Sequence, residues 1–298
     1  MGFFLEVLLG GLMAGVLYSL VALGLVLIFK ASGVFNFAQG AMVLFAALSL
    51  VRLMEKMPLP LALLVTCAIM LALAYAIERL VLRPLVNQPG ISLFMATLGI
   101  TFLLEGFGQI LWGSDIYKLD LGIPKQPVII LENVFKGGIL VGSDDLFATV
   151  VSGALVIVLA IFFQKTRIGR ALRAVADDHQ AAQSIGIPLN QIWLIVWTVA
   201  GLVALVAGVI WGSRLGVQFS LSLIALKALP VVILGGFTSV PGAIVGGLII
   251  GVGEKLSEVY LGPVIGGGIE NWFAYTVALA FLLVRPEGLF GEKLIDRV

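Results

Sequence analysis

Apolar residues fill long stretches of this chain, and polar and charged residues are confined to short segments between them. Seven uncharged runs are as long as a membrane-crossing helix, at residues 7–29, 31–51, 57–77, 84–104, 146–164, 188–213 and 228–253. An α-helix needs about 20 apolar residues to cross a bilayer core about 30 Å thick. A buried helix of a soluble protein can also be apolar all round, but seven such runs favour the membrane. The pattern predicts an all-α integral membrane protein, a polytopic helical bundle of about eight or nine transmembrane segments.

The region 221–258 departs from this simple pattern. The predicted alternation requires it to cross twice, yet its two halves are short and are separated by GGFTSVPGA. Non-helical backbone survives at membrane depth only where protein or a water-filled cavity satisfies its polar groups. Transport proteins commonly place discontinuous helices around their pathway. The region therefore predicts a broken or re-entrant helix pair, with an ordinary tight cytoplasmic turn as the alternative.

Glycines spaced by four residues recur within the apolar runs. This spacing lets helix backbones approach closely where apolar burial no longer drives association. It predicts close helix packing at four places, Gly11/Gly15, Gly208/Gly212, Gly242/Gly246 and Gly247/Gly251.

Residues 166–188, TRIGRALRAVADDHQAAQSIGIP, are the longest polar stretch closely flanked by long apolar runs. Apolar residues recur there at helical spacing, which predicts one or two amphipathic helices. The expected apolar face holds Ile168, Leu172, Val175, Ala182 and Ile185. Such a helix can lie on lipid, pack on its own bundle or dock in the groove of a partner. The alanines and the adjacent acids Asp177 and Asp178 favour a protein partner over lipid.

The distribution of basic residues predicts an orientation. Alternating the spans gathers ten Lys and Arg residues on one side, against seven on the other. The positive-inside rule makes the richer side cytoplasmic. The first apolar run has no basic residue before it, and we expect a retained span. The prediction is a single transmembrane domain over 1–298, with its N-terminus outside and its C-terminus cytoplasmic. The loop 113–145, with β-rich pieces such as PVIIL, is external, and the region 165–190 is cytoplasmic.

One span carries a polar stripe. Thr97, Thr101, Glu105 and Gln109 repeat every four residues and so lie on one helix face. Ionisable groups in hydrocarbon are costly and often mark a pathway, an ion pair or a proton relay. Glu105 and Lys227 are the residues of this kind in the predicted spans. A structural alternative is that Glu105 reaches the membrane interface, or pairs with Lys227.

The second run, SGVFNFAQGAM, places two amides among apolar residues. Asn36 and Gln39 suit hydrogen bonding between helices or to a passing polar solute, and Gly33 and Gly40 permit a bend or a close approach. Together with the stripe they complete the candidate pathway residues: Asn36, Gln39, Gly40, Thr97, Thr101, Glu105 and Lys227.

The composition argues against several other classes of protein. Only 12% of the residues are charged, against about 25% in soluble domains, and the net charge of +1 gives no case for nucleic acid. The one histidine, His179, supports neither a zinc site nor a catalytic triad. GVGEKLS only imitates the end of a phosphate-binding loop. We therefore expect no enzyme activity, metal or cofactor in this chain.

Four segments carry a resemblance to a known family: FNFAQGAM, TRIGRALRAVADDHQAAQSIGI, GGFTSVPGAIVGG and RPEGLFG. Over essentially its whole length, the sequence resembles the permease subunits of bacterial ABC importers for branched-chain amino acids. The resemblance implies a place in the bacterial cytoplasmic (inner) membrane. It also implies a second homologous permease subunit, two cytoplasmic ATPase subunits that bind ATP, and a periplasmic solute-binding protein.

The same resemblance implies that region 165–190 is the coupling helix that docks on an ATPase subunit. The residues that this carries over are Gly169, Arg173, Ala174, Asp178, Ala181, Ala182 and Gly186. In the second run the family often has a histidine and an acid beside the glycine, where this chain has Gln39 and Ala41. The solute therefore stays open between branched-chain amino acids and urea or short amides. The rival from another class is an ion-coupled secondary transporter that uses Glu105.

Overall fold

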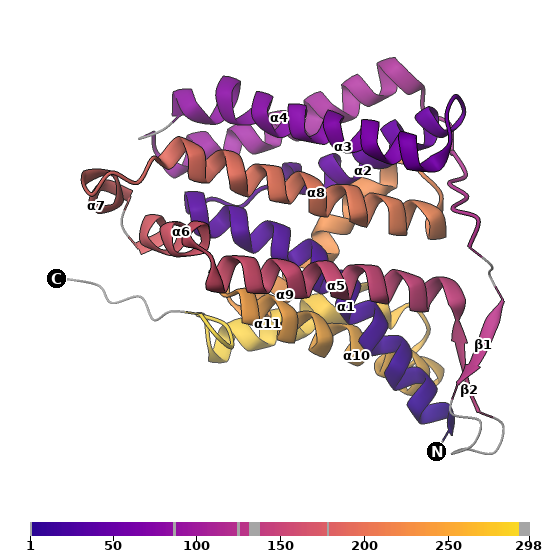
Figure 1. Cartoon of the computed structure of the whole chain (residues 1–298). Helices are drawn as coiled ribbons and strands as arrows, with labels where there is room; N and C mark the ends of the chain where they lie inside the picture. Colours follow the sequence, from indigo (N-terminus) through magenta and orange to yellow (C-terminus); the bar gives the residue numbers. More distant parts are fainter. Residues whose placement is uncertain (1, 86–87, 124–125, 131–137, 178, 292–298) are drawn as a thin grey trace. The chain divides into compact units, whose positions relative to one another are not determined.

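The computed structural model describes residues 2–85, 88–123, 126–130, 138–177 and 179–291 (Figure 1). Within these ranges the chain is mostly helical. The α-helices are α1 (Gly2–Ser32), α2 (Ala38–Met54), α3 (Leu59–Ala76), α4 (Gly90–Trp112), α5 (Ser143–Lys165), α6 (Arg167–Asp177), α7 (His179–Ser184), α8 (Leu189–Leu215), α9 (Ile224–Gly235), α10 (Val240–Ile265) and α11 (Phe273–Val284). Strands β1 (Pro127–Ile130) and β2 (Ile139–Gly142) form an antiparallel pair, which includes the β-rich PVII.

Short helical segments of other types join these elements. A π-helical stretch, Ile77–Leu82, and a 3-10 turn, Arg83–Leu85, continue α3. The 3-10 turns Phe219–Leu223 and Ile269–Asn271 precede α9 and α11. Pro263 lies within the last turn of α10.

The described residues contain six helices that are long and apolar enough to cross a membrane. They are Gly2–Ser32, Leu59–Leu85, Gly90–Trp112, Ser143–Lys165, Leu189–Leu215 and Val240–Ile265. Shorter apolar helices cover Ala38–Met54, Phe219–Gly235 and Phe273–Val284. The predicted all-α polytopic architecture is confirmed.

Two predicted runs begin too early. The run 31–51 starts within the last turn of α1, which ends at Ser32, and it includes the turn that begins at Gly33, whose φ is a left-handed 69°, before α2 begins at Ala38. The run 84–104 includes Gln88 and Pro89, which are not helical, while α4 begins at Gly90 and continues to Trp112. A run bounded by charges misplaces helix ends, because turns can be uncharged and helices can contain charges. Glu105 consequently lies about two helical turns before the C-terminal end of α4.

The chain divides into two compact units. Unit 1 comprises residues 1–23, 122–158 and 227–298, and unit 2 comprises residues 24–121 and 159–226. In unit 2, α2 packs against α3, α4 and α8, and the side chains from Ala38 to Val51 are buried all around the helix. A 17-residue helix that is apolar on nearly every side can be buried in this way. It is the centre of the unit 2 core.

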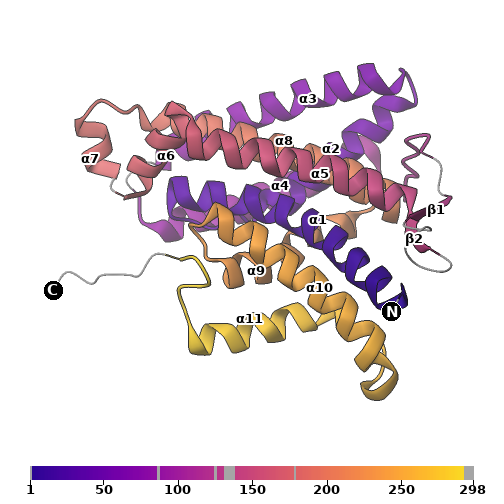
Figure 2. The same cartoon turned by 60° about the horizontal axis from the view of Figure 1, so that its bottom comes forward.

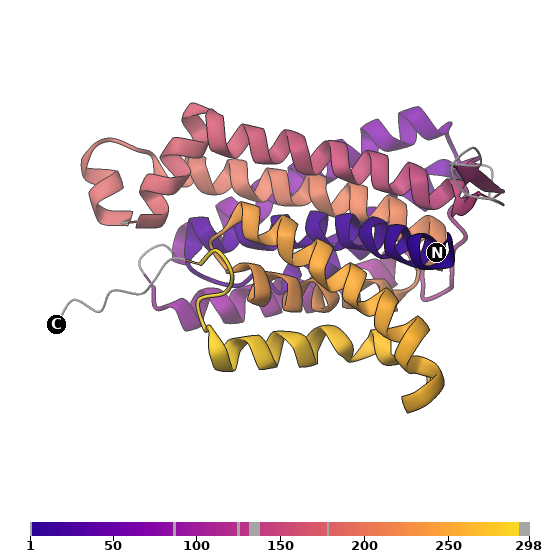
Figure 3. The same ribbon diagram turned by 90° about the horizontal axis from the view of Figure 1, so that it is seen from below.

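In unit 1, α1 and α10 lie side by side (Figures 2 and 3). A methyl group built on Gly15 would lie 2.7 Å from the Gly247 carbonyl oxygen, and one on Gly251 would lie 2.4 Å from the Gly15 nitrogen. Only glycine permits this approach. The predicted pairs Gly208/Gly212 and Gly242/Gly246 also make close contacts with other helices. Gly208 contacts Val43 on α2, and Gly246 contacts Val231 on α9. The glycine-packing prediction is confirmed.

The contact between α1 and α10 gives a stability prediction. Gly247→Ala would place a methyl carbon 2.1 Å from Ser19 Oγ and 2.7 Å from the Gly15 oxygen. The Ser19 hydroxyl shares its one proton between the Gly15 and Ile244 carbonyls, at 2.8 and 3.1 Å from Oγ. We expect a loss of about 1–3 kcal/mol through overpacking, measured by thermal unfolding in detergent. Gly262→Ala in the same helix is the matched control, because its nearest atom would be 3.9 Å away. Equal behaviour of the two variants would contradict the packing.

The region 221–258 is only partly as predicted. Helix α9 has 12 residues, so it is about 18 Å long and shorter than a bilayer core. Helix α10 has 26 residues and is not a short half, so that part of the prediction is wrong. The two helices meet tightly: a methyl group on Gly235 would lie 2.2 Å from the Gly242 oxygen. Ser239 caps α10, its side chain accepting from Gly242 N–H at 3.0 Å.

Candidate functional site

Unit 2 contains a cavity of about 170 Å³ beside the polar stripe of α4. Its wall is mostly apolar or aromatic, and its polar side chains are Thr101, Glu105 and Ser222. The other lining residues are Phe35, Phe37, Ala41, Leu98, Leu223, Ala225 and Leu226. The cavity is formed by α2 and the turn before it, by α4, and by the break between the turn Phe219–Leu223 and α9. An apolar hollow with a few polar groups is the usual form of a small-molecule site.

The α4 stripe changes from buried to exposed along the helix. Thr97 is buried, and its hydroxyl donates to the Phe94 carbonyl at 2.9 Å. Thr101 is half-buried and donates to the Thr97 carbonyl at 2.9 Å. Glu105 is half-buried, and within the described part of the chain its carboxylate has no hydrogen-bond or ion-pair partner. Gln109 is exposed. Two stripe residues, Thr101 and Glu105, therefore reach the cavity.

The side-chain amides of Asn36, just before α2, and Gln39, within it, form hydrogen bonds inside the protein. Asn36 and Gln39 are fully buried. Asn36 Oδ1 accepts from Ala38 N–H at 3.1 Å, and its Nδ2 donates to Gln39 Oε1 at 3.3 Å. Gln39 Nε2 donates to the Ala200 carbonyl at 3.2 Å, which ties α2 to α8. The structure thus engages both amides between helices, and neither lines the cavity.

Gly40 lets two parts of the cavity wall, α2 and the turn Phe219–Leu223, pack closely. A methyl group on Gly40 would lie 1.9 Å from the Ser222 carbonyl oxygen and 3.2 Å from the Ala225 methyl group. The turn Phe219–Leu223 can therefore pack directly on the α2 backbone. Next to it, the rings of Phe35 and Phe37 meet edge to face, with centroids 4.8 Å apart. Ser222, Phe35 and Phe37 were not singled out from the sequence as site residues.

Two of the candidate docking residues form the elbow between α5 and α6. A methyl group on Gly169 would lie 1.8 Å from the Phe163 carbonyl oxygen. Arg173 Nη1 donates to the same carbonyl at 2.8 Å, and Thr166 Oγ1 accepts from Gly169 N–H at 3.2 Å. The arginine thus satisfies a carbonyl at the end of α5, where a positive charge is also favoured by the helix dipole. Gly169 and Arg173 therefore both help to form the connection between α5 and α6 within the chain.

The two predicted amphipathic helices are present as α6 and α7. Leu172, Val175 and Ala182 are buried as expected, and Ala174 is half-buried. Ile185, however, is 74% exposed, so its place on the apolar face was wrong. Helix α7 ends at Ser184 and Gly186 has a φ of +87°, so helical spacing no longer applies at Ile185.

The remaining docking candidates lie near this end. Ala181 is exposed, and Gly186 is exposed with open space around it. Asp178 lies outside the described residues. At this end, the exposed Ile185 lies between the small exposed residues Ser184 and Gly186.

Two buried acids were missed from the sequence because each lies just past the end of an apolar run. Glu254 is 3% exposed on α10, where it receives a hydrogen bond from Tyr18 and interacts electrostatically with Lys227 of α9. Continuing the helical spacing beyond Gly247 and Gly251 would have placed Glu254 on the same packed face. Glu78 is also 3% exposed, in the π-helical stretch, with its Oε1 3.6 Å from Arg83 Nε.

The chain is similar to a family described as the permease component of branched-chain amino acid transport systems, whose model matches residues 7–285. The high-affinity branched-chain amino acid permease LivH of Salmonella typhimurium is 28% identical, with 99% of this chain and 98% of LivH covered. BraD of Pseudomonas aeruginosa is 27% identical, with 99% and 98% covered. The probable LivH of Methanocaldococcus jannaschii is 32% identical, with 96% and 92% covered. A solved structure, PsaBC from Streptococcus pneumoniae in complex with Fab, has 14% identity, a TM-score of 0.48 and coverage of 93% and 90%.

Proposed function

The chain belongs to the permease-component family of branched-chain amino acid transport systems, and we propose that it carries branched-chain amino acids inward as part of an ABC importer. The observation that carries the proposal is the family match over residues 7–285, which includes nearly all of the described helices. The relatives that match it over almost their full length are named as permeases for these amino acids. A multi-pass membrane protein with six long apolar helices suits this role.

The proposed partners follow from the same family. They are a second homologous permease subunit, two ATPase subunits and a solute-binding protein. ATP is hydrolysed by the ATPase subunits, and this chain supplies the path through the membrane and the contact that transmits their motion. We propose that the N-terminus lies outside and that α6 and α7 face the cytoplasm, in a bacterial inner membrane. The concentration of basic residues at 165–173 supports that orientation.

The exposed tip of the α6–α7 segment is the proposed docking surface for an ATPase subunit. The segment is part of unit 2, and its side chains Leu172, Val175 and Ala182 are buried, so it can move with that unit as a rigid element. Ala181, Ile185 and Gly186 face outward from it. Small residues around one large apolar side chain suit insertion into a groove.

Ile185→Asp tests this docking surface. Ile185 is 74% exposed, so the variant should unfold at nearly the wild-type temperature, because exposed substitutions usually change stability by about 0.5 kcal/mol or less. The amount of ATPase subunit that co-purifies with it from native membranes should fall at least about tenfold, because a charge replaces a desolvated apolar anchor. Ile185→Leu is the matched control and should retain it. Arg173 and Gly186 are less suitable positions, since Arg173 holds the elbow and Gly186 needs a left-handed backbone.

Equal retention of an ATPase by Ile185→Asp and Ile185→Leu would rule out this docking surface. Absence of any ATPase chain from the wild-type preparation, with the permease still folded, would contradict the proposed function itself.

A further inference from the structure

The polar atoms of the unit 2 cavity share one chemical property. The Thr101 hydroxyl donates its proton to the Thr97 carbonyl at 2.9 Å, and the Ser222 hydroxyl donates to the Phe219 carbonyl at 2.9 Å. A hydroxyl has one proton to donate, so each oxygen has only acceptor capacity left. The Glu105 carboxylate is also an acceptor. The polar side chains lining the cavity thus offer three acceptor groups and no free donor.

A primary ammonium is the group that complements such a set. It carries three N–H donors, no acceptor and a positive charge. The Glu105 carboxylate supplies the opposite charge in a site largely walled by apolar side chains, where a charge pair is stronger than in water. The phenylalanine rings at positions 35 and 37 add faces that attract cations. A carboxylate or an α-keto acid would meet only acceptors here.

We propose that this cavity binds the α-ammonium of a free amino acid during its passage. The ammonium pairs with Glu105 and donates to Thr101 and Ser222. An apolar side chain contacts Leu98, Leu223 and Leu226, and the α-carboxylate stays at the mouth of the cavity. The site selects for a free amine with an apolar body, and it excludes anions and gives no advantage to neutral amides. The inference rests on the proposed function and names how its solute is recognised.

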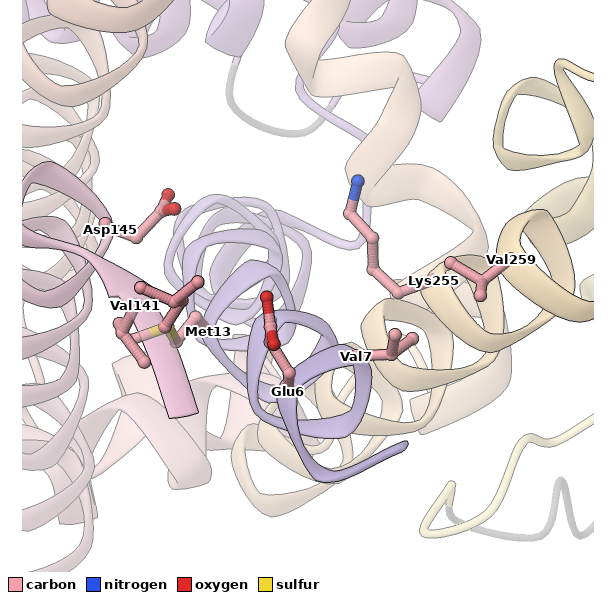
Figure 4. A pocket seen from close by; sticks show the side chains of 10 residues that line it. Glu6, Val7, Met13, Val141, Asp145, Lys255 and Val259 are labelled. Atoms are coloured by element: carbon pink, nitrogen blue, oxygen red, sulfur yellow. The ribbon is translucent and has the colours of Figure 1, made fainter. Parts of the chain in front are cut away.

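The cavity of unit 1 is the rival location. It has a volume of about 240 Å³, and Figure 4 shows Glu6, Asp145 and Lys255 around it, with Val7, Met13, Val141 and Val259. Its wall carries both signs of charge. Lys255 Nζ is already 3.0 Å from Glu270 Oε2, and Asp145 has interactions within the protein. This mixed lining lacks the acceptor-only character of the unit 2 cavity.

Photolabelling of the purified complex tests the proposal. The probe is photoleucine, which carries a diazirine in its side chain and keeps the free ammonium and carboxylate. Labelled residues are located by mass spectrometry. We expect labels on the lining residues of the unit 2 cavity, competed by leucine and not by urea. Labelling should fall about tenfold or more in Glu105→Gln, which keeps the shape but removes the charge. Glu6→Gln, the same change in the unit 1 cavity, should leave it unaltered.

N-acetyl photoleucine gives a second readout on the wild-type chain, which needs no variant. It lacks the ammonium and should label the cavity at least about tenfold less. Equal labelling by both probes, unchanged labelling of Glu105→Gln, or labels confined to the unit 1 cavity would each overturn the inference. ATP-dependent leucine uptake reports on the proposed function, and it is measured after the same preparation is reconstituted into vesicles. Uptake without selective labelling defeats the inference alone, and absence of uptake defeats the proposed function.

Discussion

Gly40→Ala is expected to reduce amino acid uptake to less than about a tenth of the wild-type rate. The added methyl carbon would lie 1.9 Å from the Ser222 carbonyl oxygen and 2.9 Å from its carbon. Both are backbone atoms, which cannot move aside as a flexible side chain can. The turn Phe219–Leu223 must therefore shift away from α2, which displaces Ser222 and the cavity wall. The cost should be about 3 kcal/mol, at the upper end of the range for overpacking.

Uptake by reconstituted vesicles and thermal unfolding in detergent measure this prediction together. Gly99→Ala is the matched control, because Gly99 lies on α4 in the same unit and has nothing within 4 Å of the added carbon. It should be neutral or slightly stabilising, since alanine favours a helix. Near-normal uptake by Gly40→Ala would show that the turn does not rest on α2 as the structure has it.

Glu254→Ala is expected to lower the free energy of unfolding by about 2–3 kcal/mol, because it removes a buried side chain and leaves the Tyr18 hydroxyl without this acceptor. The Glu254 side chain is 3% exposed, accepts from the Tyr18 hydroxyl and interacts with Lys227. The loss can be measured by thermal or chemical unfolding of the purified protein.

A second substitution separates the charge from the packing. Glu254→Gln keeps the side-chain volume and an oxygen that can accept from the Tyr18 hydroxyl, so it should keep much of the stability that Glu254→Ala loses. Similar stability of Glu254→Gln and Glu254→Ala would contradict the role given to this buried side chain. Glu6→Ala, at a half-exposed carboxylate of the same unit, should cost little.

Features that depend on composition and local spacing could be predicted from the sequence. The apolar runs predicted the spans, the glycine pairs predicted where helices touch, and the period of residues 166–188 predicted α6 and α7. Each of these depends on neighbours within a few turns of helix. Helix ends were predicted less well, since α2 starts only at Ala38 and α10 continues through Glu254 and Glu258.

The cavity could be predicted only in part, because its walls come from distant segments. The four-residue stripe identified Thr101 and Glu105, which do line it. Ser222, Phe35 and Phe37 gave no local signal, since a serine or a phenylalanine in an apolar run is ordinary. The amides Asn36 and Gln39 were candidates for a solute, but their partners are Ala38, Ala200 and each other. Local patterns do not show which polar groups find partners in the fold.

We propose above all that this chain moves amino acids with energy from ATP hydrolysed by another subunit. The most direct measurement is the uptake of radiolabelled leucine into vesicles reconstituted with the complex that this chain co-purifies, in the presence of its binding protein. We expect uptake that requires ATP on the side of α6 and α7 and that persists when ionophores collapse the proton and sodium gradients. Uptake that needs no ATP and disappears with the ion gradients would contradict it, and would make Glu105 the coupling site of a secondary transporter.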